Sequence, residues 1–175
     1  MPLVPGAIDR LAHTPSVLRA LLDAVPPEAL TSPDAGGWST RDVVSHLLII
    51  TDLGLDQRLR LLLAEDTPTL PDVNEHDSLA ASGYRDRPPA DLLDDFAAHR
   101  ANTVEWIRGL GPADLERAGI HEITGRVTAS DVVHHIAFHD LVHVAQITNL
   151  IAAPLNAARG GMGNMGSRER SKPEA

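Results

Sequence analysis

The segment HHIAFHDLVHVAQI, residues 134–147, carries four histidines among apolar residues. Positions four apart share one face of a helix, so His135, His139 and His143 would line one side, with His134 pointing about 100° away. A histidine among buried apolar side chains costs free energy unless both ring nitrogens have partners. The spacing of His139 and His143 is one by which two imidazoles on a helix reach a single metal ion.

A mononuclear metal site needs a further ligand from another helix. His46 is the candidate, because it lies in TRDVVSHLLII on a stripe that should face the core, and Gly54 on that stripe would allow a neighbouring helix to approach closely. Each of the three histidines could instead be an ordinary hydrogen-bonded core residue, so a structural role stays open at this point. Their joint placement favours a metal site on His46, His139 and His143.

The remaining histidines are weaker candidates. We expect His13, His76 and His121 to be solvated, because they lie near predicted helix ends or in loops. His99 would lie either on the surface of its helix or next to the site. A ferritin-like di-metal centre requires Glu-x-x-His pairs on two helices, and the chain contains no such pair.

Four amphipathic segments must position these side chains. Pro- or Gly-rich breaks separate them, and they cover residues 8–24, 39–64, 90–110 and 128–153. Ser39 with Asp42, and Thr128 with Asp131, form capping-box patterns that predict the starts of the second and fourth helices. Pro15 predicts a kink or a late start in the first helix. Four such helices predict an all-α fold, a four-helix bundle.

The apolar residues of the fourth helix, Ile136, Phe138, Val142 and Ile147, are predicted to face the core. This helix should end before Pro154, which divides the chain into one domain, residues 1–153, and a Gly-rich, charged tail, residues 154–175, which we expect to be mobile. Residues 67–89 show little periodicity and predict a long loop. Loops of this length are often functional, so we expect it to cover the pocket with Tyr84.

Composition narrows the classes of function. Only 3% of residues are aromatic, so the core must consist mainly of Leu, Ile, Val and Ala, which suits packed helices. A net charge of −9 without a basic cluster argues against nucleic-acid binding. Absence of a signal peptide and of a membrane-length apolar stretch predicts a cytoplasmic protein with no membrane partner. Absence of cysteine excludes disulfides and thiolate ligands from the chain itself.

Three segments of the sequence, from the second, third and fourth predicted helices, together resemble the DinB/YfiT superfamily of small metal-binding four-helix-bundle proteins. The resemblance covers residues 8–153 and is carried by GGWSTRDVVSHL, Y…DLLDDFAAHR and HHIAFHDLVHVAQI, in that order. It implies that His46, His139 and His143 are the metal ligands. Gln146 would complete the last motif without binding the ion. His135 would be either a rival ligand or a residue that supports the ligands.

The resemblance also implies a reaction on a small-molecule substrate. The expected cofactor is one divalent ion, zinc or nickel in the first place and manganese or iron as alternatives. One expected mechanism is thiol-dependent transfer, through a metal-bound thiolate from an external low-molecular-weight thiol, and the other is hydrolysis by metal-bound hydroxide. A non-enzymatic metal-binding or stress-response bundle is the remaining alternative. Apolar stretches such as LLIITDLGLDQRLRLLL make a homodimer plausible.

Overall fold

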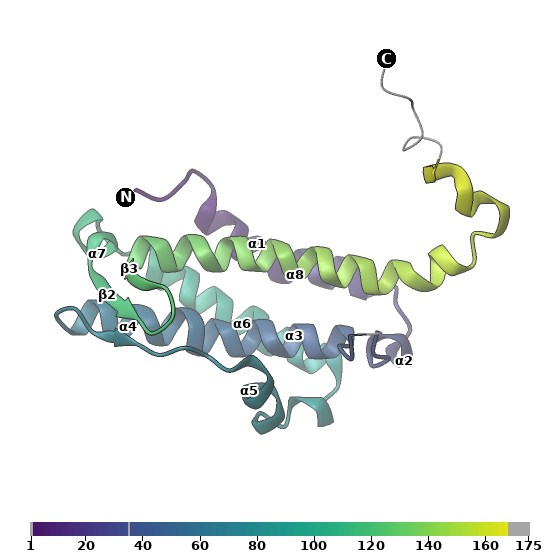
Figure 1. The fold of residues 1–175 in the computed structure, drawn as a ribbon, viewed down its shortest axis with the longest axis horizontal. Helices are drawn as coiled ribbons and strands as arrows, with labels where there is room; N and C mark the ends of the chain where they lie inside the picture. The colour runs from purple at the N-terminus through teal and green to yellow at the C-terminus, as the bar shows by residue number, and fades with distance from the viewer. Residues whose placement is uncertain (1, 35, 168–175) are drawn as a thin grey trace, which may run out of the picture.

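Four long helical segments lie side by side in the computed structural model, which describes residues 2–34 and 36–167 (Figure 1). They are α1 (Ala7–Leu22), α3 (Thr40–Ile49), α6 (Pro89–Arg108) and α8 (Ala129–Ala157). Helix α3 continues through a π-helical segment, η1 (Ile50–Asp56), into α4 (Gln57–Ala64). Helix α1 packs against α6 and α8, and α3 packs against the same two. The predicted all-α four-helix bundle is therefore confirmed.

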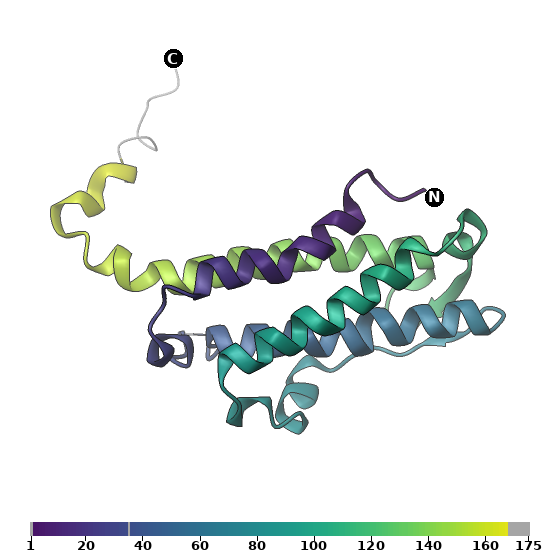
Figure 2. The same cartoon turned by 180° about the vertical axis from the view of Figure 1, so that it is seen from behind.

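The directions of the helices explain the long connection between α4 and α6. Figures 1 and 2 show α1 and α8 running one way along the bundle and α3 and α6 running the other. Because the long helical segments that contain α4 and α6 follow one another in the bundle yet run in the same direction, the chain between them must return along the bundle. This connection contains β1 (Thr69–Leu70), α5 (Glu75–Ala81) and the 3-10 turn η2 (Tyr84–Asp86). The prediction of a loop without regular structure was wrong here.

A small sheet closes one end of the bundle. Strands β2 (Ala118–His121) and β3 (Gly125–Thr128) form an antiparallel hairpin, and β1 adds in parallel to β2, giving the order β1-β2-β3. Gly119 is needed at this contact, because a Cβ there would lie 2.6 Å from the carbonyl oxygen of Pro68. Sequence patterns did not predict these strands, since segments this short show too little alternation to be recognised.

The short helices α2 (Pro27–Leu30) and α7 (Pro112–Glu116) complete the connections between the long helices. Both predicted capping boxes are present, with the backbone N–H of Asp42 donating to Ser39 Oγ at 3.2 Å and that of Asp131 donating to Thr128 Oγ1 at 3.1 Å. Helix α1 begins at Ala7, so a late start at Pro15 is excluded.

The predicted end of the fourth helix was wrong, because α8 includes Pro154 and continues to Ala157. A proline removes one backbone hydrogen bond, and this loss is tolerated near the end of a long helix on its exposed side. Of the predicted tail, residues 160–167 form the 3-10 segment η3 (Gly160–Ser167). Residues 168–175 lie outside the described residues.

The core consists of two apolar clusters, one toward each end of the bundle. The first gathers residues of η1, α4, β1 and the start of α8, among them Leu55, Leu59, Leu62, Leu70 and Val133. The second gathers residues of α1, α3 and the start of α6, among them Leu18, Val44, Leu47, Leu92 and Phe96. Leu, Ile and Val dominate both clusters, as predicted.

Two residues of α8 do not face the core as predicted. Ile136 and Ile147 are buried, but Phe138 is 65% exposed and Val142 is 45% exposed. Positions 138 and 142 lie one turn apart on the exposed side of α8, and helical spacing alone did not distinguish this side from the buried one. The homodimer predicted from the apolar stretch of residues 47–63 stays a prediction.

A polar layer separates the two apolar clusters. Its centre is a buried ion pair between Arg100 on α6 and Asp140 on α8, each 1% exposed. Arg100 Nη1 and Nη2 donate to the two carboxylate oxygens at 2.5 and 3.1 Å, and Nη2 also donates to Thr51 Oγ1 at 2.8 Å. The guanidinium also stacks on the ring of Phe96. This layer therefore joins α6, η1 and α8.

Helix α8 is the one helix of residues 2–34 and 36–167 that is long and apolar enough, by length and composition alone, to cross a membrane. Core helices of bundles pass the same test. Asp140 of α8 is paired inside the bundle and the helix packs against α1 and α3, so we describe it as a bundle helix.

Loss of the buried pair should destabilise the protein far more than loss of a surface pair. Arg100→Met leaves the Asp140 carboxylate buried without a counter-ion, and we expect the free energy of unfolding to fall by about 3–5 kcal/mol. Arg108→Met on the same helix breaks an exposed pair with Asp9, for which we expect less than about 1 kcal/mol. Urea denaturation measures both, and equal losses would contradict the central role of the buried pair.

Candidate metal centre

Three histidines from two helices meet on the inner side of the bundle. His46 comes from α3, and His139 and His143 lie one turn apart on α8. His139 Nε2 lies 3.0 Å from His46 Nε2 and 3.1 Å from His143 Nε2. One ring nitrogen from each of the three lies within 4.8 Å of the others. The structure thus brings together the three residues that sequence spacing had singled out.

The sequence around His46 explains how this side chain is held. The capping box of Ser39 and Asp42 starts α3 at Thr40, nearly two turns before His46, and the Asp42 carboxylate also accepts from Arg85 Nε at 2.8 Å. Trp38 packs edge-on against the imidazole of His46, with 5.6 Å between ring centroids. His46 is consequently only 1% exposed and has a fixed orientation.

The π-helical segment η1 follows His46 by one turn, and π-helical turns often occur at functional sites. Gly54 lies within this segment, where a Cβ would stand 2.9 Å from Ile50 Cγ2 and 3.8 Å from Ile136 Cδ1 of α8. A larger residue would therefore clash with Ile50 of its own segment. The predicted close approach of a neighbouring helix at Gly54 stays a prediction, because a Cβ there would be at ordinary van der Waals distance from Ile136 of α8.

Gln146 determines which nitrogen of His143 faces the cluster. The Gln146 Oε1 atom lies 2.7 Å from His143 Nδ1, and an amide oxygen can only accept. His143 Nδ1 therefore donates, and the neutral ring presents the lone pair of Nε2 to the other two histidines. Ligand histidines in metal sites are oriented in the same way by an acceptor behind them.

Burial keeps two of the imidazoles neutral. Desolvation, followed by the charge of His143, lowers the pKa of His46 to about 3. Desolvation also lowers the pKa of His139 to about 3, with His143 and His46 adding to the effect. Both rings are therefore uncharged at neutral pH, which is the form that binds a metal ion.

The donor set fits a small cation better than it fits hydrogen bonding alone. His139 Nε2 has two ring nitrogens within hydrogen-bond distance but at most one proton to donate, so hydrogen bonding alone cannot satisfy all three nitrogens. Nitrogens that share a zinc ion at the usual bond length lie roughly 3.3 Å apart. The observed separations are close to this value.

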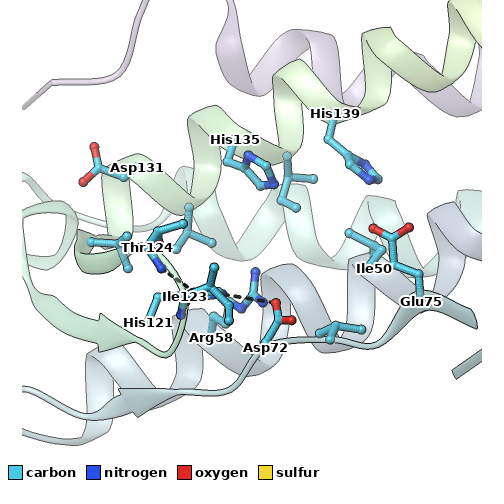
Figure 3. Close-up of a pocket in the computed structure, with 14 residues that line it drawn as sticks. Ile50, Arg58, Asp72, Glu75, His121, Ile123, Thr124, Asp131, His135 and His139 are labelled. Carbon is cyan, nitrogen blue, oxygen red and sulfur yellow. Dashed lines mark hydrogen bonds and ion pairs between the residues drawn. The ribbon is translucent and has the colours of Figure 1, made fainter. Parts of the chain in front are cut away.

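A cavity of about 340 Å³ opens beside the cluster (Figure 3). His139 lies at its wall, and apolar residues from η1 and α8, Ile50, Val132 and Ile136, form much of the lining. Figure 3 shows His135 projecting into the cavity from α8, next to His139, and their ring centroids are 6.0 Å apart. His135 is thus outside the three-histidine cluster and faces the cavity instead.

The long connection between α4 and α6, called the crossover connection below, contributes to this cavity through Asp72, Val73 and Glu75. Its predicted role in covering the pocket is therefore supported. Tyr84, however, packs against the apolar cluster around α3 and does not line the cavity. Sequence reasoning missed helix α5. Its signal was available, because Asn74 accepts from the backbone N–H of Asp77 in the same N-cap pattern that identified α3.

The other histidines are placed as follows. His121 was predicted to be solvated and is instead 9% exposed and lines the cavity, since the unpredicted strand β2 carries it inward. His134 points away from the cluster and accepts from the backbone N–H of Val4 at 2.8 Å. His99 lies 3.0 Å from Asp56 and takes no part in the cluster. His13 and His76 are exposed, as predicted.

Fold and site together define a four-helix-bundle protein with a three-histidine centre beside a small cavity. The family model of the DinB superfamily matches residues 10–147, and the chain belongs to that superfamily.

Several relatives span most of this chain. Two of them, from Oceanobacillus iheyensis and Bacillus mycoides, are named provisionally as metal-dependent hydrolases, and each is 26% identical to this chain. Both matches cover 82% of this chain, and they cover 83% of the Oceanobacillus protein and 82% of the Bacillus mycoides protein. YfiT of Bacillus subtilis, which carries the same kind of name, is 27% identical over 82% of this chain and 81% of its own. The solved structure of YfiT, described as a four-helix bundle of unusual topology, superimposes with a TM-score of 0.77 over 85% of each chain at 23% identity, which establishes the common fold.

The low pKa values of His46 and His139 predict how stability depends on pH when no metal is bound. Above about pH 6.5 the two imidazoles are neutral in both folded and unfolded chains. As the pH falls from there toward the folded-state pKa of about 3, the unfolded chain binds protons that the folded protein does not, so the free energy of unfolding decreases.

Urea denaturation in the presence of a chelator, at about pH 7 and about pH 5, measures this decrease. The double variant His46→Gln/His139→Gln should show a smaller decrease, whereas His13→Gln, an exposed position on α1, should behave as wild type. Equal decreases in wild type and the double variant would contradict the assignment.

Proposed function

We propose that this protein is a metal-dependent hydrolase that holds one divalent ion on His46, His139 and His143. The observation that carries the proposal is the convergence of three imidazole nitrogens, with two of the rings kept neutral by burial, at the wall of a cavity. The provisional names of the relatives support the same class of reaction.

The three histidines contribute no charge, so the ion they hold keeps its full positive charge. When bound, such an ion would supply Lewis acidity, which would polarise the bond to be cleaved and lower the pKa of water. Zinc and nickel suit an all-imidazole donor set, with manganese or iron as alternatives. Gln146 orients His143 through its Nδ1–H, and Trp38 covers His46.

Glu75 is the proposed proton acceptor for the attacking water. Three carboxylates line the cavity. Asp131 caps α8, and Asp72 lies beside His121 and Arg58, away from His139 (Figure 3). Within residues 2–34 and 36–167, Glu75 has no hydrogen-bond or ion-pair partner. Its carboxylate points toward His139 in Figure 3.

Helix α5 places Glu75 close to the cluster. The next residue on this helix, His76, packs edge-on against Trp38 with 5.8 Å between ring centroids, and Trp38 in turn contacts His46. The charge of His76 also contributes to lowering the pKa of His46, after desolvation and the charge of His143. The first turn of α5 therefore lies beside the histidines and can deliver a carboxylate to them.

The second candidate function is thiol-dependent transfer at the same site. The chain contains no cysteine, so no thiol of its own competes for the open side of the histidine cluster, and an external low-molecular-weight thiol would have free access from the cavity. Turnover that requires an added thiol would favour this function over hydrolysis. Turnover of an ester in the absence of thiol would favour the hydrolase.

The metal content of protein purified without contact with nickel tests the central claim. We expect about one equivalent of a divalent ion per chain in wild type, and almost none in His46→Gln or His143→Gln. His13→Gln, on the exposed side of α1, should retain the wild-type content. Wild-type protein that can be loaded with neither zinc, nickel nor manganese would overturn the proposal.

The role of Glu75 predicts a specific kinetic defect. Glu75→Gln should lower kcat for hydrolysis of a simple chromogenic ester by about 100-fold or more, with unchanged metal content. Glu105→Gln, exposed on α6 and away from the cavity, is the matched control. Unchanged kcat in Glu75→Gln would exclude Glu75 as the proton acceptor.

A further inference from the structure

Arg58 on α4 is a half-buried cation that lines the cavity and has few partners. Its Nη2 donates to the carbonyl oxygen of Pro71 at 3.0 Å, while its Nε is buried without a hydrogen-bond partner. No carboxylate of the described residues lies within ion-pair distance of Arg58, although Asp72 attracts it from farther away. A guanidinium offers five N–H donors, so most of its donor capacity is unused.

Two imidazoles lie on the cavity wall with Arg58. The backbone N–H groups of Ile123 and Thr124 donate to His121 Nδ1 at 3.2 and 3.4 Å, so the neutral ring carries its proton on Nε2. Asp72 Oδ1 lies 3.9 Å from this Nε2, beyond hydrogen-bond distance, so the N–H can still donate to a ligand. Figure 3 shows Arg58, His121 and Asp72 together on the side of the cavity opposite α8, from which His135 projects. Desolvation, and then the charges of Arg58 and His121, lower the pKa of His135, so the three groups act on one another.

The remaining charges around the cavity decide which anion fits. Asp72 and Glu75 are exposed carboxylates of the crossover connection, and Asp131 is engaged as the cap of α8. One guanidinium balances a singly charged carboxylate. A doubly charged phosphate would be repelled more strongly by these carboxylates. The lining between Arg58 and His139 is largely apolar.

We propose that Arg58, assisted by the N–H groups of His121 and His135, binds a carboxylate group of the substrate. The substrate class is then a small molecule with an apolar body and a carboxylate, whose bond to be cleaved lies at the three-histidine end of the cavity. Guanidinium–carboxylate pairing and the cavity volume both suit such a molecule. The identity of the cleaved bond rests on the proposed function, whereas the carboxylate subsite can be tested by binding alone.

The test compares binding of hexanoate with binding of its neutral analogue hexanamide by calorimetry, using the protein as purified. Wild type should prefer hexanoate by about tenfold or more, and Arg58→Gln should lose this preference. Arg60→Gln is the matched control, because Arg60 lies on the same helix but packs on Trp106 outside the cavity. Any binding of hexanoate to the metal itself contributes equally to the affinities of wild type, Arg58→Gln and Arg60→Gln, so it does not affect their comparison.

His121→Asn provides a second, independent variant on strand β2. The Asn side chain can still accept from the backbone N–H groups of the turn but lacks the Nε2 donor, so the preference for hexanoate should fall about threefold or more. Equal preferences in wild type, Arg58→Gln and His121→Asn would overturn the subsite, as would wild type that does not prefer hexanoate. The affinities of inorganic phosphate and of hexanoate can be compared by displacement of bound hexanamide. A higher affinity for phosphate would overturn the assignment to a carboxylate.

Hydrolysis of two esters separates this inference from the proposed function. One ester is neutral, and the other carries a carboxylate on its apolar chain. If wild type hydrolyses neither but retains its preference for hexanoate, the proposed hydrolase fails and the subsite stands. If wild type hydrolyses both and Arg58→Gln keeps the wild-type ratio of kcat/KM values, the subsite fails and the hydrolase stands.

Discussion

The buried ion pair of Arg100 and Asp140 is the interaction on which the arrangement of the bundle depends. A fully buried pair is tolerated only if its geometry is good and its remaining donors are satisfied, and the bidentate contact with the added bond to Thr51 meets most of this requirement. Because Asp140 adjoins His139 on α8, the pair also limits rotation of α8 about its axis. With that rotation limited, the face carrying His139 and His143 is directed toward His46.

The topology of the bundle provides the cavity. The long helical segments that contain α4 and α6 follow one another in the bundle and run in the same direction, so the connection between them, which includes α5, passes along the outside of the bundle rather than turning tightly. This passage brings Asp72, Val73 and Glu75 opposite α8 and leaves a space beside the histidines. The segment that appears least regular in the sequence is therefore part of the proposed active site.

The site combines groups of different electrostatic character within a short distance. Burial among apolar residues keeps His46 and His139 neutral, which prepares them to bind a cation, and Gln146 orients the third imidazole. The opposite wall carries Arg58, whose donors are mostly unused. A cation would be shared by the converging ring nitrogens of the histidines, and an anionic group of the substrate near Arg58 would accept from donors that the protein alone leaves unused.

The sequence by itself determined the four helices, their capping boxes and the three candidate ligands, because each depends on residues within about four positions along one helix. Only the tertiary structure decided that strand β2 carries His121 inward and that Arg58 shares a cavity with His139. The same holds for the exposed side of α8 at Phe138. These features arise from contacts between segments far apart in the chain, such as the pairing of β1 with β2, and helical periodicity carries no information about them.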